Sequence, residues 1–475
     1  MNLNVLFINK VQFRKHKINV FIESFGVLVA TLLLIIPSPI TFASQTHLTA
    51  IDQYIELIDS NKKAMFSLAI VDDGKVVYQN QIGHAYTENS NNTPISPDEN
   101  TRYTIASISK TFTATMIFQL IEQGKLSLDT KLSEFYPKFD QSNDITIDHL
   151  LSHQSGIYNY TNSPEFVQYY TQYQSNEKML ERFYSYPNEF KPGTGWQYSN
   201  TGYYLLGLII EDVTGQSYEK NLKQRITDKL QLSHTAFCRD YSHCKFNTQS
   251  YAFWNKQWFE QAVWHPSITA GAGGLISTPT ELGIFMDALF NGELVSIETI
   301  EVMKALNTGF SKGFWNMPYF YKTAWGHNGS IEGFQSQLVY FDSEKVAFAF
   351  TGNGLNESQR KIMTTIIGLY FDKSVTIPDY NRPFISIAPI ELKKYLGHYK
   401  TDAMPLKGEL FLEDGQLMGK WDDQESIAFQ ALTETEFESR ENGIVLEFVT
   451  FPSGKINYRQ VTLYQRGWEL EFYRQ

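Results

Sequence analysis

Cysteine is the scarcest residue of this 475-residue chain, with only Cys238 and Cys244. The two lie close together, and in an exported protein such a pair is expected to form a disulfide that closes a small surface loop. A metal site that also uses His234 and His243 is the alternative, but these residues lack the regular spacing of metal ligands. No cofactor or metal motif is evident elsewhere, so we expect none.

Basic residues are also scarce relative to acidic ones. The chain has 40 Lys and Arg against 51 Asp and Glu, which gives a net charge of −11. A surface that binds nucleic acid needs clustered Lys and Arg, and no basic stripe follows the first 20 residues. We therefore expect no nucleic-acid partner, and the acidic balance otherwise bears on solubility alone.

The N-terminal part lacks an apolar run long enough for a membrane span. Its apolar run, residues 25–36, has about 12 residues, whereas a spanning helix needs roughly 20. Basic residues precede this run, two prolines break it, and Thr-Phe-Ala at 41–43 offers a cleavage site. We expect a signal peptide over 1–43 and an exported protein, periplasmic or extracellular. An uncleaved N-terminal anchor is the alternative, and no cysteine follows closely enough for a bacterial lipoprotein anchor.

Apolar and aromatic residues, in contrast, are plentiful. At 42% hydrophobic and 15% aromatic, the chain can build a large core, and its length indicates two or three domains. We expect a main domain over 44–372, a proline-containing linker over 373–389 and a small β-rich domain over 390–475. In the last segment, short alternating runs are broken by Asp-Gly, Asn-Gly and Ser-Gly, which is typical of an antiparallel sheet or small barrel.

The main domain carries strand patterns at both ends and helix patterns between them. Two strands are predicted over 65–71 and 76–83, with the hairpin signal Asp-Asp-Gly between them. Two more are predicted over 334–341 and 345–351, followed by a helix over 357–371. This order predicts an α+β domain in which helices cover one antiparallel sheet.

The stretch 101–111, TRYTIASISKT, holds the most reactive combination of side chains. Apolar residues three and four apart predict a helix over 112–123, so Ser107 should lie at or just inside its start. Lys110 follows three residues later and shares the face of Ser107. Unpaired N–H groups at a helix start favour negative charge, so a serine beside a possible base there can act as a nucleophile. Most Ser and Lys pairs of this spacing, however, form an ordinary solvated face.

Two other segments carry polar groups at junctions. Tyr198 and Asn200 end an irregular loop where a helix begins, which can place a phenol and an amide in one cleft. The tyrosine-rich stretch 158–190 could wall that cleft or form a helical subdomain.

His149 and His153 lie four apart in a helix predicted to end at Gly156. They could bind a metal, but no third ligand is evident, and a hydrogen-bonded polar face is the simpler interpretation.

Three segments in this order resemble the serine β-lactamase and penicillin-binding superfamily. They are Ser107-x-x-Lys110, Tyr198-x-Asn200 and His327-Asn328-Gly329. The flanking segments LLSHQSGI and AGAGGLISTPTELGIF also resemble the branch that holds class C β-lactamases, DD-carboxypeptidases, D-aminopeptidases and related esterases. The resemblance covers about 65–371 and implies the β-lactamase/transpeptidase-like fold, with an all-helical subdomain beside the sheet.

The resemblance also implies a role for each residue. Ser107 would attack a carbonyl to give an acyl-enzyme, and Lys110 and Tyr198 would pass its proton. Asn200 would hold the acyl side chain, and the segment His327-Asn328-Gly329 would bind substrate along the sheet edge. The N–H groups of Ser107 and Ser330 would form the oxyanion hole. The sequence leaves open which of Lys110 and Tyr198 is deprotonated.

One departure affects the expected substrate. Typical β-lactamases have Lys-Thr-Gly where this chain has His327-Asn328-Gly329, and a histidine holds a substrate carboxylate less reliably than a lysine. We therefore expect a serine hydrolase for D-amino-acid peptides or esters, with a small-molecule or cell-wall peptide as partner. A class C β-lactamase and a non-catalytic penicillin-binding or sensing protein are the alternatives. The oligomeric state is left open.

Overall fold

The computed structural model describes residues 40–88, 93–237, 239, 248–306, 311–403, 406–422 and 424–475. The chain consists of two compact units, Met1–Phe42 and Ala43–Gln475. Most of the predicted signal peptide, together with Cys238 and Cys244, lies outside the described residues. Within the described ranges, no helix is both long and apolar enough to cross a bilayer.

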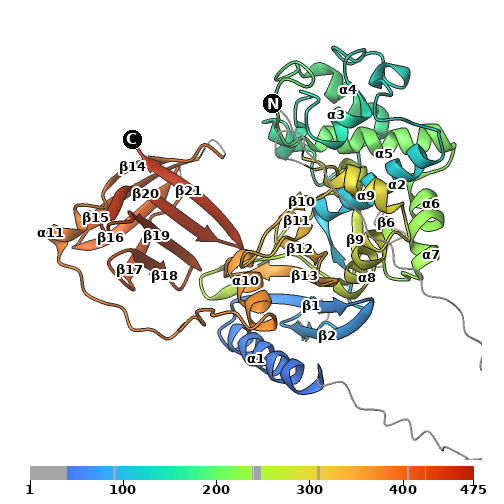
Figure 1. Cartoon of the computed structure of the whole chain (residues 1–475). Coiled ribbons are helices and arrows are strands. Elements are labelled where there is room, and N and C mark those ends of the chain that lie inside the picture. Colours follow the sequence, from blue (N-terminus) through green and yellow to red (C-terminus); the bar gives the residue numbers. More distant parts are fainter. Residues whose placement is uncertain are drawn as a thin grey trace, which may run out of the picture. The chain divides into compact units, whose positions relative to one another are not determined.

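A six-stranded antiparallel sheet forms the centre of the main domain (Figure 1). Its order is β10-β11-β12-β13-β1-β2, so strands from the two ends of the domain are neighbours in the sheet. The predicted hairpin joins β1 to β2, and Gly74 in its turn has a φ of 73°. The bounds are β1 Ala64–Asp72, β2 Lys75–Ile82, β10 Trp315–Asn316, β11 Trp325–Ile331, β12 Phe334–Phe341 and β13 Val346–Leu355.

Helices cover both faces of this sheet. Side chains alternate along each strand, so Phe66 and Phe348 pack against α1 (Ile40–Ser60) and α10 (Gln359–Tyr370) on one face. Ala349 and Leu338 belong to the core on the other face. There they meet α8, which spans Pro279–Phe290, and α2, which spans Ser109–Glu122. The sheet is thus enclosed between two layers of helices.

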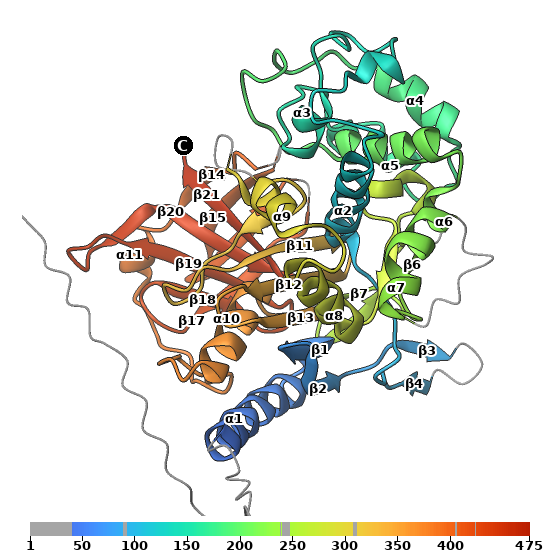
Figure 2. The same ribbon diagram turned by 45° about the vertical axis from the view of Figure 1, so that its right-hand side comes forward.

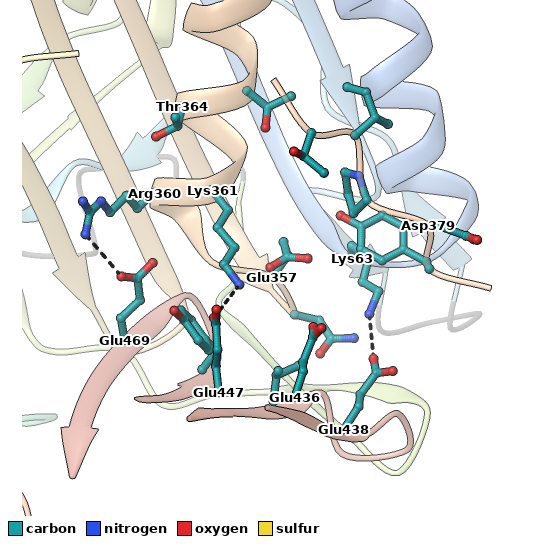
Figure 3. Close-up of a pocket in the computed structure, with 18 of the residues that line it drawn as sticks. Lys63, Glu357, Arg360, Lys361, Thr364, Asp379, Glu436, Glu438, Glu447 and Glu469 are labelled. Atoms are coloured by element: carbon teal, nitrogen blue, oxygen red, sulfur yellow. Dashed lines mark hydrogen bonds and ion pairs between the residues drawn. The ribbon is translucent and has the colours of Figure 1, made fainter. Parts of the chain in front are cut away.

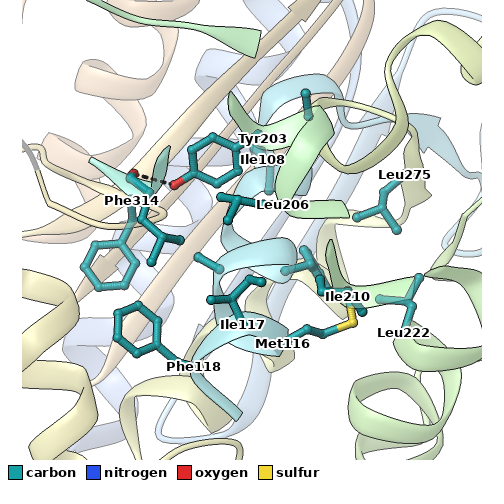
Figure 4. Packing of buried hydrophobic residues seen from close by; sticks show 14 of the residues in the cluster. Ile108, Met116, Ile117, Phe118, Tyr203, Leu206, Ile210, Leu222, Leu275 and Phe314 are labelled. Carbon is teal, nitrogen blue, oxygen red and sulfur yellow. Dashed lines mark hydrogen bonds between the residues drawn. The ribbon is translucent and has the colours of Figure 1, made fainter. Parts of the chain in front are cut away.

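A mainly helical region lies above one end of the sheet (Figure 2). Its central helix is α5, Asn200–Thr214, whose apolar side chains interlock with those of α2. Figure 4 shows Met116 and Ile117 of α2 beside Leu206 and Ile210 of α5. The other helices here are α3 Ile147–Leu151, α4 Asn176–Ser185, α6 Tyr218–Leu222, α7 Asp228–Leu230 and α9 Ile297–Lys304. Packing of α2 against α5 joins the Ser107 segment to the Tyr198 segment.

Short strands complete the main domain: β3 Tyr86–Glu88, β4 Thr93–Ile95, β5 Tyr103–Thr104, β6 Ala236–Phe237, β7 Tyr251–Trp254, β8 Gln257–Glu260 and β9 Leu275–Ser277. Of these, β5 pairs with β9, which fixes the chain just before Ser107. Thr278 caps α8 by accepting a hydrogen bond from the Glu281 N–H, as its Thr-Pro-x-Glu sequence suggests.

The C-terminal segment forms a closed antiparallel barrel, so the second of the two predicted architectures is the one observed. Turns at Asp414-Gly415 and Asn442-Gly443 join neighbouring strands, and alternate apolar residues such as Leu446, Phe448 and Leu463 fill the interior. The short helix α11, Pro389–Leu392, precedes it. The strands are β14 Gly397–Lys400, β15 Lys407–Glu413, β16 Gln416–Trp421, β17 Ile427–Ala431, β18 Glu436–Ser439, β19 Ile444–Thr450, β20 Ile456–Gln465 and β21 Trp468–Arg474.

The predicted α+β class with a small β domain is confirmed, but one predicted helix was wrong in extent. Helix α3 ends at Leu151, not at Gly156. The chain leaves the helix because His153 adopts a left-handed φ of 58°, which a continuing α-helix does not allow. His149 and His153 therefore do not share a helix face.

Candidate active site

Ser107 lies in a short turn, Ala106–Ile108, that leads directly into α2. Ala106 has a φ of 46°, a left-handed conformation that costs a non-glycine residue about 1 kcal/mol or more. The turn is held from both sides. The Ser336 hydroxyl of β12 donates to the Ile105 carbonyl at 2.8 Å, and the Leu275 N–H donates to Ser109 Oγ at 3.1 Å. The partly exposed Ser107 side chain is thus fixed on a rigid corner.

Lys110 is fully buried directly beneath this serine. Its Nζ lies 3.1 Å from Ser107 Oγ, 2.8 Å from Asn200 Oδ1 and 2.6 Å from the Ala272 carbonyl oxygen. No carboxylate is among these partners. Burial therefore lowers the pKa of Lys110 well below its ordinary value, because a charged ammonium would lose its hydration without gaining a counter-ion.

These three contacts fit a neutral amine as well as an ammonium, because each of the three oxygens can accept a hydrogen bond. An amine has two N–H donors and one lone pair, whereas an ammonium has three donors and no acceptor. Asn200 Oδ1 and the Ala272 carbonyl can only accept, so they take the two N–H groups. Because burial favours the neutral amine, its lone pair then remains for the proton of Ser107.

Tyr198 reaches the same serine from the start of α5. Its hydroxyl donates to Ser107 Oγ at 2.9 Å, and its ring lies 4.9 Å from Lys110 Nζ. Burial raises the pKa of Tyr198 above its ordinary value, partly offset by the hydrogen bond with Ser107. The phenol therefore keeps its proton near neutral pH. Of the two groups that the sequence could not distinguish, Lys110 is the better base and Tyr198 the better proton donor.

Asn200 has its side chain engaged within the protein. Besides accepting from Lys110, its Nδ2 donates to Thr161 Oγ1 at 3.2 Å, and its backbone N–H donates to Asn159 Oδ1 at 3.1 Å. Part of the tyrosine-rich stretch 158–190 thus supports the site. Because Asn200 is itself held by Thr161 and Asn159, its Oδ1 fixes the position of the Lys110 amine. Asn200 thus has a role within the protein, separate from any contact with a substrate.

His327 on β11 faces the site, and its ring centroid is 6.5 Å from that of Tyr198 and 5.4 Å from that of Trp315. Burial, reinforced by the positive charge that Lys110 can carry, lowers the pKa of His327 to about 3. The Nδ1 atom lies 2.5 Å from the Asn328 carbonyl oxygen. His327 is therefore a neutral ring near pH 7 and offers no cation to a substrate carboxylate.

The next two residues of the motif, Asn328 and Gly329, do not present a side chain to the site. Asn328 pairs with Gln337, so strand alternation places its side chain on the face opposite to that of His327. Gly329 lies against the serine turn, where a Cβ atom would be 2.2 Å from the Ile105 carbonyl oxygen. The structure thus brings Gly329 to the nucleophile through its backbone and leaves the Asn328 side chain on the other side of the sheet.

The N–H of Ser330 is directed towards the open edge of β11. The Met317 N–H of the neighbouring β10 segment donates to the Ala324 carbonyl, so the backbone groups of Ala324 face away from β12. Along a regular strand the same direction recurs at every second residue, which includes Ser330. Strand β10 pairs with β11 only as far as Gly326, so among the described residues no strand covers this edge beside Ser330.

His153 lies beside the active site, a position that the sequence did not predict. Its ring is buried and lies 4.5 Å from the ring of Tyr198, and its Nδ1 accepts from the Ser199 N–H at 3.2 Å. Burial and the charge of Lys110 lower its pKa well below the ordinary value. His149 instead accepts from the Thr146 N–H at the start of α3. Within the described residues, no group of three His, Cys, Asp or Glu side chains could hold a metal.

Comparison with known proteins shows the family to which the chain belongs. The profile of the beta-lactamase family matches residues 54–370. The teichoic acid D-alanine hydrolase of Staphylococcus aureus is 28% identical over 305 residues, which are 62% of this chain and 72% of that protein.

Two solved structures resemble both the fold and the sequence. The octameric penicillin-binding protein homologue from Pyrococcus abyssi has a TM-score of 0.61 and 25% identity, and covers 89% of this chain and 99% of its own. The D-stereospecific amidohydrolase from Streptomyces sp. has a TM-score of 0.55 and 25% identity, and covers 64% of this chain and 94% of its own. Since the family match extends over well more than half of its length, the chain belongs to the beta-lactamase family of serine hydrolases, as its three motifs predicted.

Proposed function

We propose that the protein hydrolyses esters or amides of D-amino acids through an acyl-enzyme on Ser107. The observation that carries this proposal is the full burial of Lys110 beside Ser107 with no carboxylate among its contacts. Two acceptors, Asn200 Oδ1 and the Ala272 carbonyl, occupy its N–H groups and leave its lone pair beside Ser107 Oγ. A base held in this way can take the serine proton at neutral pH.

In the first step, Ser107 Oγ attacks the substrate carbonyl carbon while its proton passes to Lys110 Nζ. The backbone N–H groups of Ser107 and Ser330 stabilise the resulting oxyanion, each contributing about 3 kcal/mol. When the tetrahedral intermediate collapses, the leaving alkoxide or amine takes a proton from the Tyr198 hydroxyl. The proton on Lys110 then passes to the Tyr198 phenolate, which restores the neutral amine and the phenol.

In the second step, water attacks the acyl carbon and releases the acid. Lys110, neutral again, is the base for this water, and the proton that it takes restores the Ser107 hydroxyl as the ester bond breaks. The two steps together add one water across the ester or amide bond. Neither step draws on a group beyond Ser107, Lys110, Tyr198 and the two backbone donors.

The substrate class rests on the relatives and on His327. The Staphylococcus aureus relative is a teichoic acid D-alanine hydrolase and the Streptomyces relative a D-stereospecific amidohydrolase, and both names imply a D-configured substrate. His327 is neutral near pH 7, so the site lacks the cation that holds the carboxylate of a β-lactam. This favours D-aminoacyl esters and amides over β-lactams.

A substrate panel tests the proposal. Purified protein is assayed with D-alanine and L-alanine esters, D-alaninamide, a D-Ala-D-Ala peptide and nitrocefin, beside the Ser107→Ala variant. We expect turnover of the D-alanine ester or amide well above the L-form, and none in the variant. Faster turnover of nitrocefin would favour the class C β-lactamase alternative. Turnover of none of them above the variant would favour a non-catalytic binding protein.

We further propose that the protein acts outside the cytoplasm, on D-alanine in the cell envelope. The basic residues, short apolar run and Thr-Phe-Ala of the N-terminal region support export. N-terminal sequencing of protein recovered from outside the cytoplasm should give a chain that starts near residue 44. Recovery from the cytoplasm alone, with an intact N-terminus, would contradict this.

A further inference from the structure

Gln335 connects the edge strand of the active site to the C-terminal barrel. It lies on β12 directly opposite Ser330, and only 5% of its surface is exposed. Its Nε2 donates to Ser330 Oγ at 3.0 Å and lies 3.4 Å from the carbonyl oxygen of Arg466. A side-chain amide has two N–H groups, so one can serve each acceptor.

The turn between β20 and β21 rests directly on this glutamine. Arg466 and Gly467 both have positive φ, at 52° and 81°, which makes a tight turn. A Cβ on Gly467 would lie 3.2 Å from Leu355 and 3.3 Å from Gln335, so the barrel backbone is in contact with the central sheet here. The barrel thus contacts Gln335 of β12, and Gln335 in turn contacts Ser330 of β11.

Four ion pairs of the described residues connect the main domain to the barrel, and all four are oriented in the same way. The main domain supplies the cations and the barrel the carboxylates: Lys63 with Glu438 at 3.4 Å, Arg360 with Glu469 at 3.7 Å, Lys361 with Glu447 at 3.6 Å and Lys256 with Glu441 at 2.7 Å. Figure 3 shows three of them around a cavity of about 880 Å³. An interface this polar and open is sensitive to salt and to charge reversal, unlike a dry apolar one.

We propose that Gln335 is a positioning residue for hydrolysis and that the barrel completes the active site through it. By holding Ser330 Oγ from one side and the Arg466 carbonyl from the other, Gln335 fixes β11 at the point where the Ser330 N–H must meet the oxyanion. This inference rests on the proposed function, because it concerns the oxyanion donor of that reaction. It gives the C-terminal barrel a task in catalysis.

The physical reason is the precision that such a donor needs. A backbone N–H stabilises an oxyanion only when it is preorganised at hydrogen-bond distance, and a displacement of about 1 Å can cost about 100-fold in rate. Pairing of β10 with β11 reaches only as far as Gly326, opposite Trp315, so among the described residues the segment of Ser330 has a neighbouring strand, β12, on one side only. Gln335 supplies an additional hydrogen bond at this less supported position.

Kinetics of the full chain test the role of Gln335. We expect Gln335→Leu to lower kcat by about tenfold to 100-fold with KM within twofold, because the oxyanion exists only in the transition state. Ser330→Ala, which keeps the N–H and removes the Oγ, should have a similar effect, and the double variant should be no worse than either. The matched control is Gln337→Leu, on the same strand and face, whose Nε2 donates to Tyr319 OH at 2.5 Å. An unchanged kcat in Gln335→Leu, or an equal loss in Gln337→Leu, would overturn the proposal.

The barrel's contribution is tested by charge reversal at Lys63 and Glu438, whose side chains are 12% and 8% exposed. Lys63→Glu should lower kcat severalfold, and Lys63→Glu combined with Glu438→Lys should restore it. Added salt should lower kcat of the wild type more than that of Gln335→Leu, in which the connection is already broken. Loss of kcat in Lys63→Glu that the second substitution does not restore would count against barrel docking.

Hydrogen exchange separates this proposal from that of the acyl-enzyme. In Gln335→Leu, amides of β11 should exchange at least tenfold faster than in the wild type, while those of α2 keep their rates. This readout needs no substrate. If wild-type protein turns over no substrate but the β11 effect is present, the proposed function fails and the structural connection stands. If β11 exchange is unchanged, the connection itself is refuted.

Discussion

Acid should destabilise the folded protein through His327, and the size of the effect follows from its surroundings. Burial holds the pKa of His327 at about 3 in the folded state, whereas the unfolded chain has the ordinary value of 6.5. Between these values the unfolded chain binds a proton that the folded protein does not. The stabilisation is therefore complete above pH 6.5 and is lost as the pH falls towards 3.

One pKa unit corresponds to about 1.4 kcal/mol. At pH 5 the unfolded histidine is almost fully protonated, about 1.5 units below its pKa, so His327 alone should lower the free energy of unfolding by about 2 kcal/mol. Taken to pH 3, the loss approaches about 5 kcal/mol. His153 has its pKa lowered for the same physical reasons and adds a loss of the same sign.

The assay is urea unfolding followed by tryptophan fluorescence at pH 7 and pH 5. His327→Gln keeps a polar side chain that does not titrate, so its free energy of unfolding should fall by about 2 kcal/mol less than that of the wild type over this range. His398→Gln, at a barrel position whose side chain is 72% exposed, is the matched control. Equal pH dependence in wild type and His327→Gln would refute the account of a buried, neutral histidine.

Three further predictions concern the nucleophile and its supports. Lys110→Met and Tyr198→Phe should each lower kcat by about 10²–10⁴-fold with the melting temperature nearly unchanged, since proton transfer contributes on that scale. The pH profile of kcat/KM should rise with pH through a pKa below 10.5, because the pKa of Lys110 is lowered by burial and only its neutral form is a base. Gly329→Ala should destabilise the protein by about 1–3 kcal/mol and remove activity, because its Cβ would meet the Ile105 carbonyl.

Each of these three predictions can be contradicted by a specific result. Activity losses in Lys110→Met or Tyr198→Phe that follow a loss of melting temperature would indicate structural roles. A rising limb at or above pH 10.5 would mean that the lysine titrates as in water. Thermal unfolding of Gly329→Ala at the wild-type temperature, with activity retained, would show that the serine turn can move.

Local sequence signals predicted the scaffold well. The Asp-Asp-Gly turn predicted the β1–β2 hairpin, and the spacing of apolar residues predicted Ser107 at or just inside a helix start, where the structure has it in the turn that leads into α2. These features depend on neighbours within a few residues. The strand patterns at the two ends of the domain predicted the sheet that joins them, and the family resemblance added the roles of the three motifs.

Other features depend on contacts between distant residues and left no local signal. Helix α3 resembles a longer helix in sequence, but the chain turns away at His153, whose contacts with Ser199 and Tyr198 come from residues far along the sequence. The protonation of Lys110 depends on which acceptors surround it. The contact of Gln335 with Arg466 joins residues far apart in the chain, so no pattern around either of them could reveal it.

The most direct test of the account is covalent labelling of Ser107 across pH. Wild-type protein is treated with a fluorophosphonate and with a fluorescent penicillin, and intact-mass and peptide spectra locate the adduct. We expect one adduct on the peptide that contains Ser107, formed faster as the pH rises through the lowered pKa of Lys110, and no adduct in Ser107→Ala. No adduct from either reagent on the wild type, or an adduct on another residue, would contradict it.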